Sequence, residues 1–439
     1  MHKRTLQLKS NIIYSLLFKG LSVLATLCIV PITLNYVDKN QYGVWLVLSS
    51  IIGWFSFFDI GLGNGLKTKL TESLTDGELI KARKYISTTY LLMFFISLAI
   101  SIVFLISQYF IKWSEILNTD ILPEETLKKV VFIVFTSFSI QFILNVIVTV
   151  AAANQNTIIG AIINFLINSI TLLIIYILTL AFVNGTLVDL SLPMALTPVG
   201  VLIIANIYLF STKYKDISPR LTFFDVTLLK EIFGLGWKFF IIQLGLILVY
   251  NIDNLIIAQL FGPAEVTTYN VAFRYFSIIT MLSGIIMAPL WAAFGEANRI
   301  KDYQWIKGTI KKLQFVILIL ALLSFCMAVF APWVYKFWVG KEIPIPLLLS
   351  IILAVYTVVN AFRTIYIYYM NGVGIITLQV ILVGLTGLLN IPLGIFLGKL
   401  LGVPGVVLAT LILSVISGII EYIQFRKIIS GQATGIWNR

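Results

Sequence analysis

The sequence has few of the residues on which most enzymes and metal sites depend. Its 439 residues include one histidine, His2, and two cysteines, Cys28 and Cys326, and only 11% of the chain is charged. A single histidine at the N-terminus argues against histidine triads and histidine-rich metal sites. Both cysteines lie in apolar runs, so no disulfide framework is indicated. We therefore expect no catalytic residue, no bound metal and no cofactor.

Hydrophobic residues dominate the chain instead. They make up 59% of it, and the mean hydropathy is +0.99. A run of roughly 20 apolar residues matches the thickness of the hydrocarbon core, and about twelve such runs are present. The sequence therefore predicts an all-α polytopic membrane protein. The expected spans are 11–35, 44–66, 86–109, 129–152, 158–182, 192–211, 234–261, 267–294, 310–332, 344–370, 375–398 and 403–425.

The distribution of basic residues predicts the orientation in the membrane. Lysine and arginine concentrate in the N-terminal tail, in the loops after the second, sixth and eighth spans, and in the C-terminal tail. By the positive-inside rule this face is cytoplasmic, and both termini are expected there. Topology and contact with anionic lipid headgroups explain the net charge of +12, so we expect no nucleic-acid partner.

The basic loop at 212–233 divides the spans into two sets of six. We expect an N-terminal lobe at 1–211, a cytoplasmic inter-lobe loop at 212–233, and a C-terminal lobe with a short cytoplasmic tail at 234–439. A tyrosine opens the second span of each half and a tryptophan lies beyond the third. Their separations nearly agree, at 71 residues from Tyr42 to Trp113 and 69 from Tyr269 to Trp338. This pattern favours two related six-helix lobes around a central cavity.

Among the charges inside the predicted spans we single out five: Lys19, Asp59, Asp253, Arg274 and Arg363. A charge that faces lipid costs several kcal/mol, so each is expected to face the protein interior. The helical rise places Lys19 level with Asp59, and Asp253 level with Arg274, so each couple can pair. We find no acid level with Arg363 in adjacent spans, which makes it the first candidate to meet an anionic group.

Each of these residues also has a structural interpretation. Lys19 can snorkel toward the headgroups, and Asp253 with Arg274 can clamp two helices together. Asn164 and Asn168 are four residues apart and share one helical face. Their amides can hydrogen-bond to a neighbouring helix, or they can line a cavity that recognises sugar hydroxyl groups.

Two groups of short motifs stand at the start of each half. The first half has Pro31 to Asn35, Tyr42-Gly43 and Asp59-Ile60-Gly61-Leu62-Gly63, and the second half has Asp253 to Ala258, Phe261-Gly262 and Tyr269-Asn270-Val271-Ala272. These motifs resemble the bacterial polysaccharide-transport family, which contains the O-antigen flippases and belongs to the multidrug/oligosaccharidyl-lipid/polysaccharide exporter superfamily. The resemblance covers nearly the whole chain in span number and loop layout, and it implies a location in the bacterial inner membrane. One departure is Thr268, where the motif of the second half often has glycine before the tyrosine.

The resemblance implies a V-shaped pair of lobes that works by alternating access, coupled to an ion gradient. It implies an undecaprenyl-diphosphate-linked oligosaccharide as cargo, moved from the inner to the outer leaflet for surface polysaccharide synthesis. Membrane lipids, a polysaccharide polymerase and other assembly proteins are the further partners. The hypothetical cargo contacts are Arg363, Arg274, Lys19, Asn164 and Asn168, and the hypothetical coupling residues are Asp59 and Asp253.

Two other functions stay open at this stage. A cation-coupled small-molecule exporter of the same superfamily would have the same architecture. A membrane polysaccharide polymerase is disfavoured because the longest predicted outer loop, 110–128, is short for an enzyme of that kind.

Overall fold

The computed structural model describes residues 2–54, 62–154, 156–182, 185–231, 252–287, 290–340 and 343–438, and within these ranges the regular elements are helices. The chain divides into two compact units, Met1–Gln243 and Leu244–Arg439. We refer to them as the N-terminal unit and the C-terminal unit, and describe each by itself.

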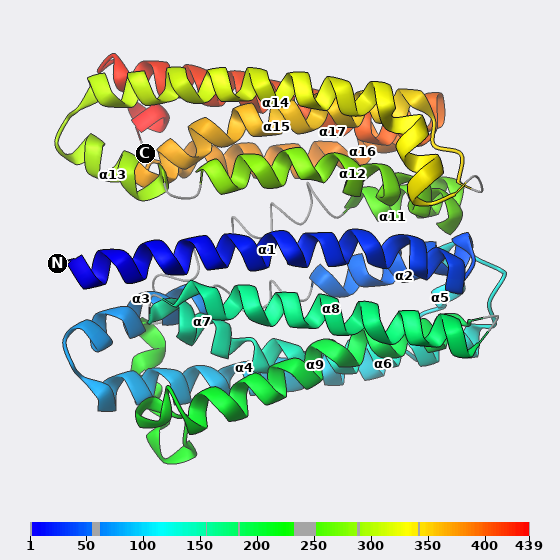
Figure 1. Ribbon diagram of the computed structural model, residues 1–439, viewed down its shortest axis with the longest axis horizontal. Coiled ribbons are helices and arrows are strands. Elements are labelled where there is room, and N and C mark those ends of the chain that lie inside the picture. Colours follow the sequence, from blue (N-terminus) through cyan, green and yellow to red (C-terminus); the bar gives the residue numbers. More distant parts are fainter. Residues whose placement is uncertain are drawn as a thin grey trace. The chain divides into compact units, whose positions relative to one another are not determined.

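The N-terminal unit contains nine α-helices and three short 3₁₀ turns among its described residues. Helix α1 lies along α8, and α6 lies along α9 (Figure 1). The elements are α1 (His2–Tyr36), α2 (Lys39–Trp54), α3 (Leu62–Thr75), α4 (Leu79–Ser107), α5 (Trp113–Leu117), α6 (Glu124–Leu144), α7 (Val146–Ala153), α8 (Thr157–Ala181), α9 (Leu187–Ser211), η2 (Lys215–Ile217), η3 (Leu221–Phe223) and η4 (Val226–Leu228).

Helix α3 illustrates how sequence pattern sets packing in this unit. Leu62, Leu66 and Leu70 recur every four residues, so they share one face, and all three are fully buried in a core with α4, α7 and α9. Lys67 and Glu72 lie on the opposite, exposed side. This division into an apolar and a charged face indicates a helix that packs on the bundle while its other side meets water or headgroups.

The C-terminal unit is built around α15. Figure 1 shows α15 between α14 and α12, and it also contacts α13 and α17. Together with α17 it is among the most buried of the long helices. The elements are α11 (Ile252–Phe261), α12 (Pro263–Met287), α13 (Leu290–Arg299), α14 (Tyr303–Trp338), α15 (Leu347–Val373), α16 (Thr377–Leu401), α17 (Val403–Ile429) and η5 (Gly435–Asn438).

Two glycines let the backbones of α13 and α15 touch. A Cβ atom on Gly372 would lie 2.4 Å from the carbonyl oxygen of Trp291, and one on Gly295 would lie 2.6 Å from the carbonyl oxygen of Gly372. Both distances are too short for any side chain. Close approach at small residues is a usual way to hold helices together where lipid replaces water as solvent.

The prediction of an all-α polytopic membrane protein is confirmed. Ten described helices are long and apolar enough to cross a membrane, and each coincides with one of the predicted spans. The other two predicted spans, 44–66 and 234–261, include residues 55–61 and 234–251, which lie outside the described residues. Their described parts are α2 with the start of α3, and α11.

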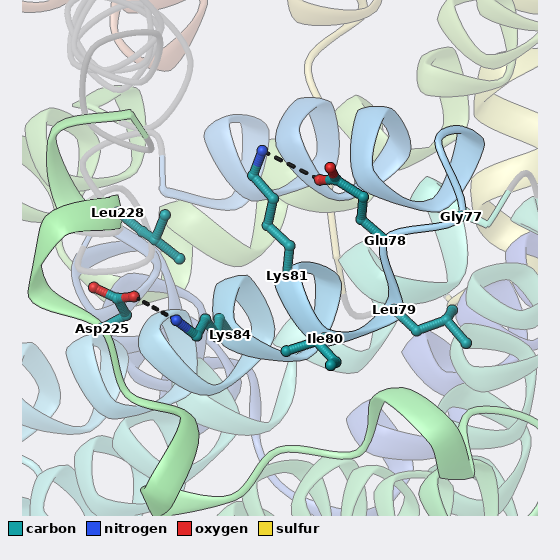
Figure 2. Close-up of a pocket in the computed structure, with 8 residues that line it drawn as sticks. All are labelled: Gly77, Glu78, Leu79, Ile80, Lys81, Lys84, Asp225 and Leu228. Atoms are coloured by element: carbon teal, nitrogen blue, oxygen red, sulfur yellow. Dashed lines mark hydrogen bonds and ion pairs between the residues drawn. The ribbon is translucent and has the colours of Figure 1, made fainter.

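The predicted inter-lobe loop is described as far as residue 231, and three 3₁₀ turns form within this part. Its 3₁₀ turns pack against α4. Lys84 Nζ lies 2.9 Å from Asp225 Oδ2, Ser87 Oγ accepts a hydrogen bond of 3.1 Å from the backbone N–H of Arg220, and the Tyr85 hydroxyl donates to Glu231. Figure 2 shows the pocket beside the first turn of α4, where Lys81 contacts Glu78 and Lys84 reaches across to Asp225.

The carboxyl group of Asp225 gives this docking a pH dependence. Hydrogen bonds from Thr227 and Lys84 lower its pKa from 3.8 to about 2. Thr227 lies in the loop itself, so the bond to Lys84 is the part of this lowering that belongs to docking. That contact stabilises docking above the ordinary pKa of 3.8, and the stabilisation is lost as the pH falls toward 2. We predict that the protection of residues 212–231 against hydrogen exchange, relative to the intrinsic exchange rate at the same pH, falls several-fold in Lys84→Ala at pH 7, and in the wild type on acidification from pH 4 to pH 2.

Lys81→Ala is the matched control, because the ion pair of Lys81 among the described residues is with Glu78, the N-cap residue of its own helix, at 3.2 Å. It should leave exchange in the loop unchanged. An equal loss of protection against exchange in both variants would mean that the overall positive charge of α4, and not the contact with Asp225, holds the loop.

Candidate functional site

A buried carboxylate joins three helices of the C-terminal unit. Asp253 on α11 is 4% exposed. Its Oδ1 accepts a hydrogen bond of 3.1 Å from the Asn390 amide on α16. The Thr410 hydroxyl on α17 lies 3.2 Å from Asp253 Oδ2 and 3.1 Å from Asn390 Oδ1. A hydroxyl has one proton, so Thr410 can donate to only one of these acceptors at a time.

Both groups that donate to Asp253 among the described residues are neutral. The ion pairs in the described part of the chain join other side chains. A carboxylate buried among neutral groups is costly unless it binds a proton or a cation. The oxygens of Asp253, Asn390 and Thr410 lie close together, so this cluster has the chemistry to bind either a proton or a hard cation.

A second buried charge cluster connects α15 to α17. Arg363 and Glu421 are 7% and 2% exposed. The guanidinium donates from Nη2 to Glu421 Oε1 at 2.8 Å and from Nε to Oε2 at 3.1 Å. This is a bidentate pair, the geometry in which arginine binds a carboxylate most strongly.

The expectation that no acid lies level with Arg363 is therefore wrong. Glu421 lies inside the predicted span 403–425, on the last helix, and is not one of the five charges singled out above. Its signal in the sequence is an acidic residue within an otherwise apolar span. The pair neutralises both charges and makes Arg363 a connection between two helices.

A glycine makes room for this pair. Gly418 on α17 lies one turn before Glu421, and a Cβ atom there would come within 2.9 Å of Arg363 Cγ. Beyond the arginine, Tyr366 and Tyr369 are fully buried. Their rings pack against Phe425 with centroid distances of 5.4 and 5.2 Å. These tyrosines form part of the core of the unit.

The predicted cargo residues of the N-terminal unit lie on α1 and α8. Asn168 on α8 donates from Nδ2 to Ser22 Oγ on α1 at 2.8 Å, and the rings of Phe18 and Phe165 pack beside this contact at 5.5 Å. Asn168 thus ties the two helices together. Lys19 and Asn164 are exposed on the surface of this unit.

Two further predicted site residues are Arg274 and Asp59. Arg274 is half-buried on α12, and its pairing with Asp253 is not among the ion pairs of the described residues. Asp59 lies outside the described residues, so its pairing with Lys19 stays a prediction. Sequence reasoning did not identify Asn390 and Thr410, which lie 137 and 157 residues from Asp253.

Comparisons with known proteins give a consistent result. Residues 37–343 match the family described as polysaccharide biosynthesis protein. A candidate O-antigen export protein of Yersinia pseudotuberculosis is 22% identical over 363 residues, which are 79% of this chain and 78% of that protein. A candidate O-antigen transporter of Salmonella typhi is 24% identical over 288 residues, 63% of this chain and 62% of that protein.

Solved structures show the fold. A multidrug-resistance MATE-family transporter of the MOP superfamily, in its inward-facing conformation, superimposes with a TM-score of 0.79 at 15% identity, over 96% of this chain and 98% of that chain. An outward-facing structure of a MATE-family transporter gives a TM-score of 0.66 at 17% identity, over 98% and 97% of the two chains. At these identities the likeness concerns the fold alone.

The ion pair between α15 and α17 makes a clear prediction for stability. Arg363→Ala leaves Glu421 buried without its partner, which costs about 3 to 5 kcal/mol. Replacing both residues by methionine removes both charges at similar volume and should restore most of the lost stability. Thermal unfolding of the purified protein in detergent measures this.

Arg274→Ala is the control, at a half-buried arginine of the same unit. It should change stability much less than Arg363→Ala. If the double methionine variant were no more stable than Arg363→Ala, the buried charge of an unpaired Glu421 would not be the cause of the loss.

Proposed function

This chain belongs to the family of polysaccharide biosynthesis proteins, and on that premise we propose that it moves an undecaprenyl-diphosphate-linked oligosaccharide from the inner to the outer leaflet. The match over residues 37–343 is the observation that carries the proposal. The multi-pass helical architecture and the MATE-type transporter fold support it, as do the relatives described for O-antigen export. The cargo then serves surface polysaccharide synthesis by other assembly proteins, including a polymerase.

The proposed location is the bacterial inner membrane, with both termini in the cytoplasm. The excess of lysine and arginine on one predicted face supports this orientation. A lipid-linked cargo suits such a protein because its polyprenyl tail can stay in the bilayer while the polar glycan crosses through a protein cavity. Alternating access would present that cavity to each leaflet in turn.

We propose that Asp253 couples transport to an ion gradient. A carboxylate with neutral donors in a low-dielectric interior can exist in two states. In one it binds a proton or a cation, and in the other it has released that ion to water. Asn390 and Thr410 belong to two other helices, so a change in the charge of Asp253 changes hydrogen bonds that join α11, α16 and α17. Asp59 remains the alternative coupling residue.

The proposed cationic contacts with the diphosphate are Lys19 and Arg274, with Asn164 available to the glycan. Lys19 and Asn164 are exposed and Arg274 is half-buried, so their polar groups can reach a ligand. Arg363 and Asn168 also remain candidates. However, Arg363 already bonds to Glu421 and Asn168 already bonds to Ser22, which supports a role for both residues in holding helices together.

A cation-coupled small-molecule exporter is the second candidate function. The observation that favours it is the fold, since the superimposed structures are those of multidrug-resistance MATE transporters. Both functions predict the same helices and the same coupling chemistry, so cargo assays separate them. The family does not suggest an enzyme.

The cargo proposal predicts the outcome of a direct flipping assay. The purified protein in proteoliposomes should move a fluorescent lipid-linked oligosaccharide between leaflets, measured by its accessibility to a membrane-impermeant quencher. The same vesicles should not accumulate or expel a cationic dye. Movement of the dye without movement of the glycan lipid would support the exporter instead.

The coupling proposal predicts that Asp253→Asn removes the dependence of flipping on an imposed proton or sodium gradient. The rate with a gradient should fall to the rate without one, typically a loss of tenfold or more, while thermal stability is largely kept because asparagine can still hydrogen-bond. Asp76→Asn, at an exposed aspartate between α3 and α4, is the control and should respond to the gradient as the wild type does. Retained gradient dependence in Asp253→Asn would assign coupling to another residue.

A further inference from the structure

A basic pocket lies between α14 and α17 at one end of the C-terminal unit. Its volume is about 530 Å³. Lys307 and Lys311, four residues apart on one face of α14, line one side, and Arg426 in the last turn of α17 lines the other. All three side chains are exposed. The pocket is therefore open to a ligand from outside the protein.

The polar groups of this pocket suit an anion. Three of its described lining residues are cationic and none of them is acidic. Tyr422, Gln314 and Ser430 also line the pocket. The Gln314 amide donates to Tyr366, the Ser430 hydroxyl donates to the carbonyl oxygen of Lys427, and Tyr422 accepts from Arg426, so the three cations are the groups that attract the anion. The pocket in Figure 2 differs in its charge balance, because its lysines, Lys81 and Lys84, are each paired with a carboxylate.

The lysines that are next to these residues in the sequence do not line the pocket. Lys427 follows Arg426 in the sequence, but its ammonium lies 4.1 Å above the ring of Trp437. Lys312 follows Lys311 and is exposed, but it does not line the pocket. The convergence of Lys307, Lys311 and Arg426 is thus a local feature of the α14 and α17 surfaces.

An exposed apolar surface continues from the pocket along both helices. On α14, Phe315, Leu318 and Leu322 are 64%, 67% and 65% exposed, and they follow Lys311 at helical spacing. On α17, Ile419 and Ile423 are exposed one to two turns before Arg426. Both helices are long enough to span a membrane, so this surface meets acyl chains.

We propose that the pocket binds the phosphate headgroup of an anionic phospholipid, with the acyl chains along the exposed apolar surfaces of α14 and α17. Basic pockets between membrane helices on the cytoplasmic side are suited to such headgroups. The positive-inside orientation places this end of α14 at the inner leaflet. The bound lipid is a structural ligand of this protein and is distinct from the transported cargo.

The test is binding of fluorescent phosphatidylglycerol to the purified full-length protein in mixed micelles, without any cargo lipid. Each cation near a lipid surface strengthens binding about fivefold, so Lys307→Ala with Lys311→Ala should weaken it roughly 25-fold. Lys312→Ala is the matched control on the same helix and should leave the affinity unchanged. Arg426→Gln is an independent variant on the opposite helix, expected to weaken binding about fivefold.

Three results would overturn the proposal. An equal loss in Lys312→Ala would mean that general surface charge attracts the lipid. Equal binding of zwitterionic phosphatidylcholine would remove the requirement for negative charge. Full displacement of the lipid by inorganic phosphate or pyrophosphate at similar concentration would identify a site for a soluble anion. Because no transport is measured, failure here leaves the proposed flipping function untouched.

Discussion

Polar groups buried away from water need hydrogen-bonding or charged partners. In the C-terminal unit, α17 supplies such a partner to each of the two buried clusters. Glu421 on this helix holds the guanidinium of Arg363, and Thr410, three turns earlier, contacts the carboxylate of Asp253. Gly418 leaves the space that the arginine stem occupies. A buried α17 in contact with α11, α15 and α16 is therefore required for both clusters.

The two clusters differ in charge balance, and this suggests different roles. Arg363 and Glu421 neutralise each other in a bidentate pair, so neither gains from changing its charge. Asp253 is held by an amide and a hydroxyl within the described residues, which leaves its charge to be matched by a proton or a cation. The first arrangement suits a fixed joint between helices. The second suits a group that changes state during a transport cycle.

The sequence predicts the membrane helices well because a span must be apolar over its whole length. It predicts contacts between helices poorly, since those depend on which faces meet. Asp253 could be identified as an intramembrane charge, but its partners Asn390 and Thr410 lie far along the chain. Glu421 is visible in the sequence as an acid near the end of the last span, but its pairing with Arg363 depends on how α15 and α17 pack. The docking of the inter-lobe loop on α4 also depends on tertiary contacts that no local pattern encodes.

The most direct test of this account is difference infrared spectroscopy of the purified protein between low and high proton or sodium concentration. We expect a carboxyl band that changes with the ion, that is missing in Asp253→Asn, and that persists in Thr410→Ala with a shifted frequency. A band that is unchanged in Asp253→Asn would contradict the assignment of Asp253 as the group that changes its charge.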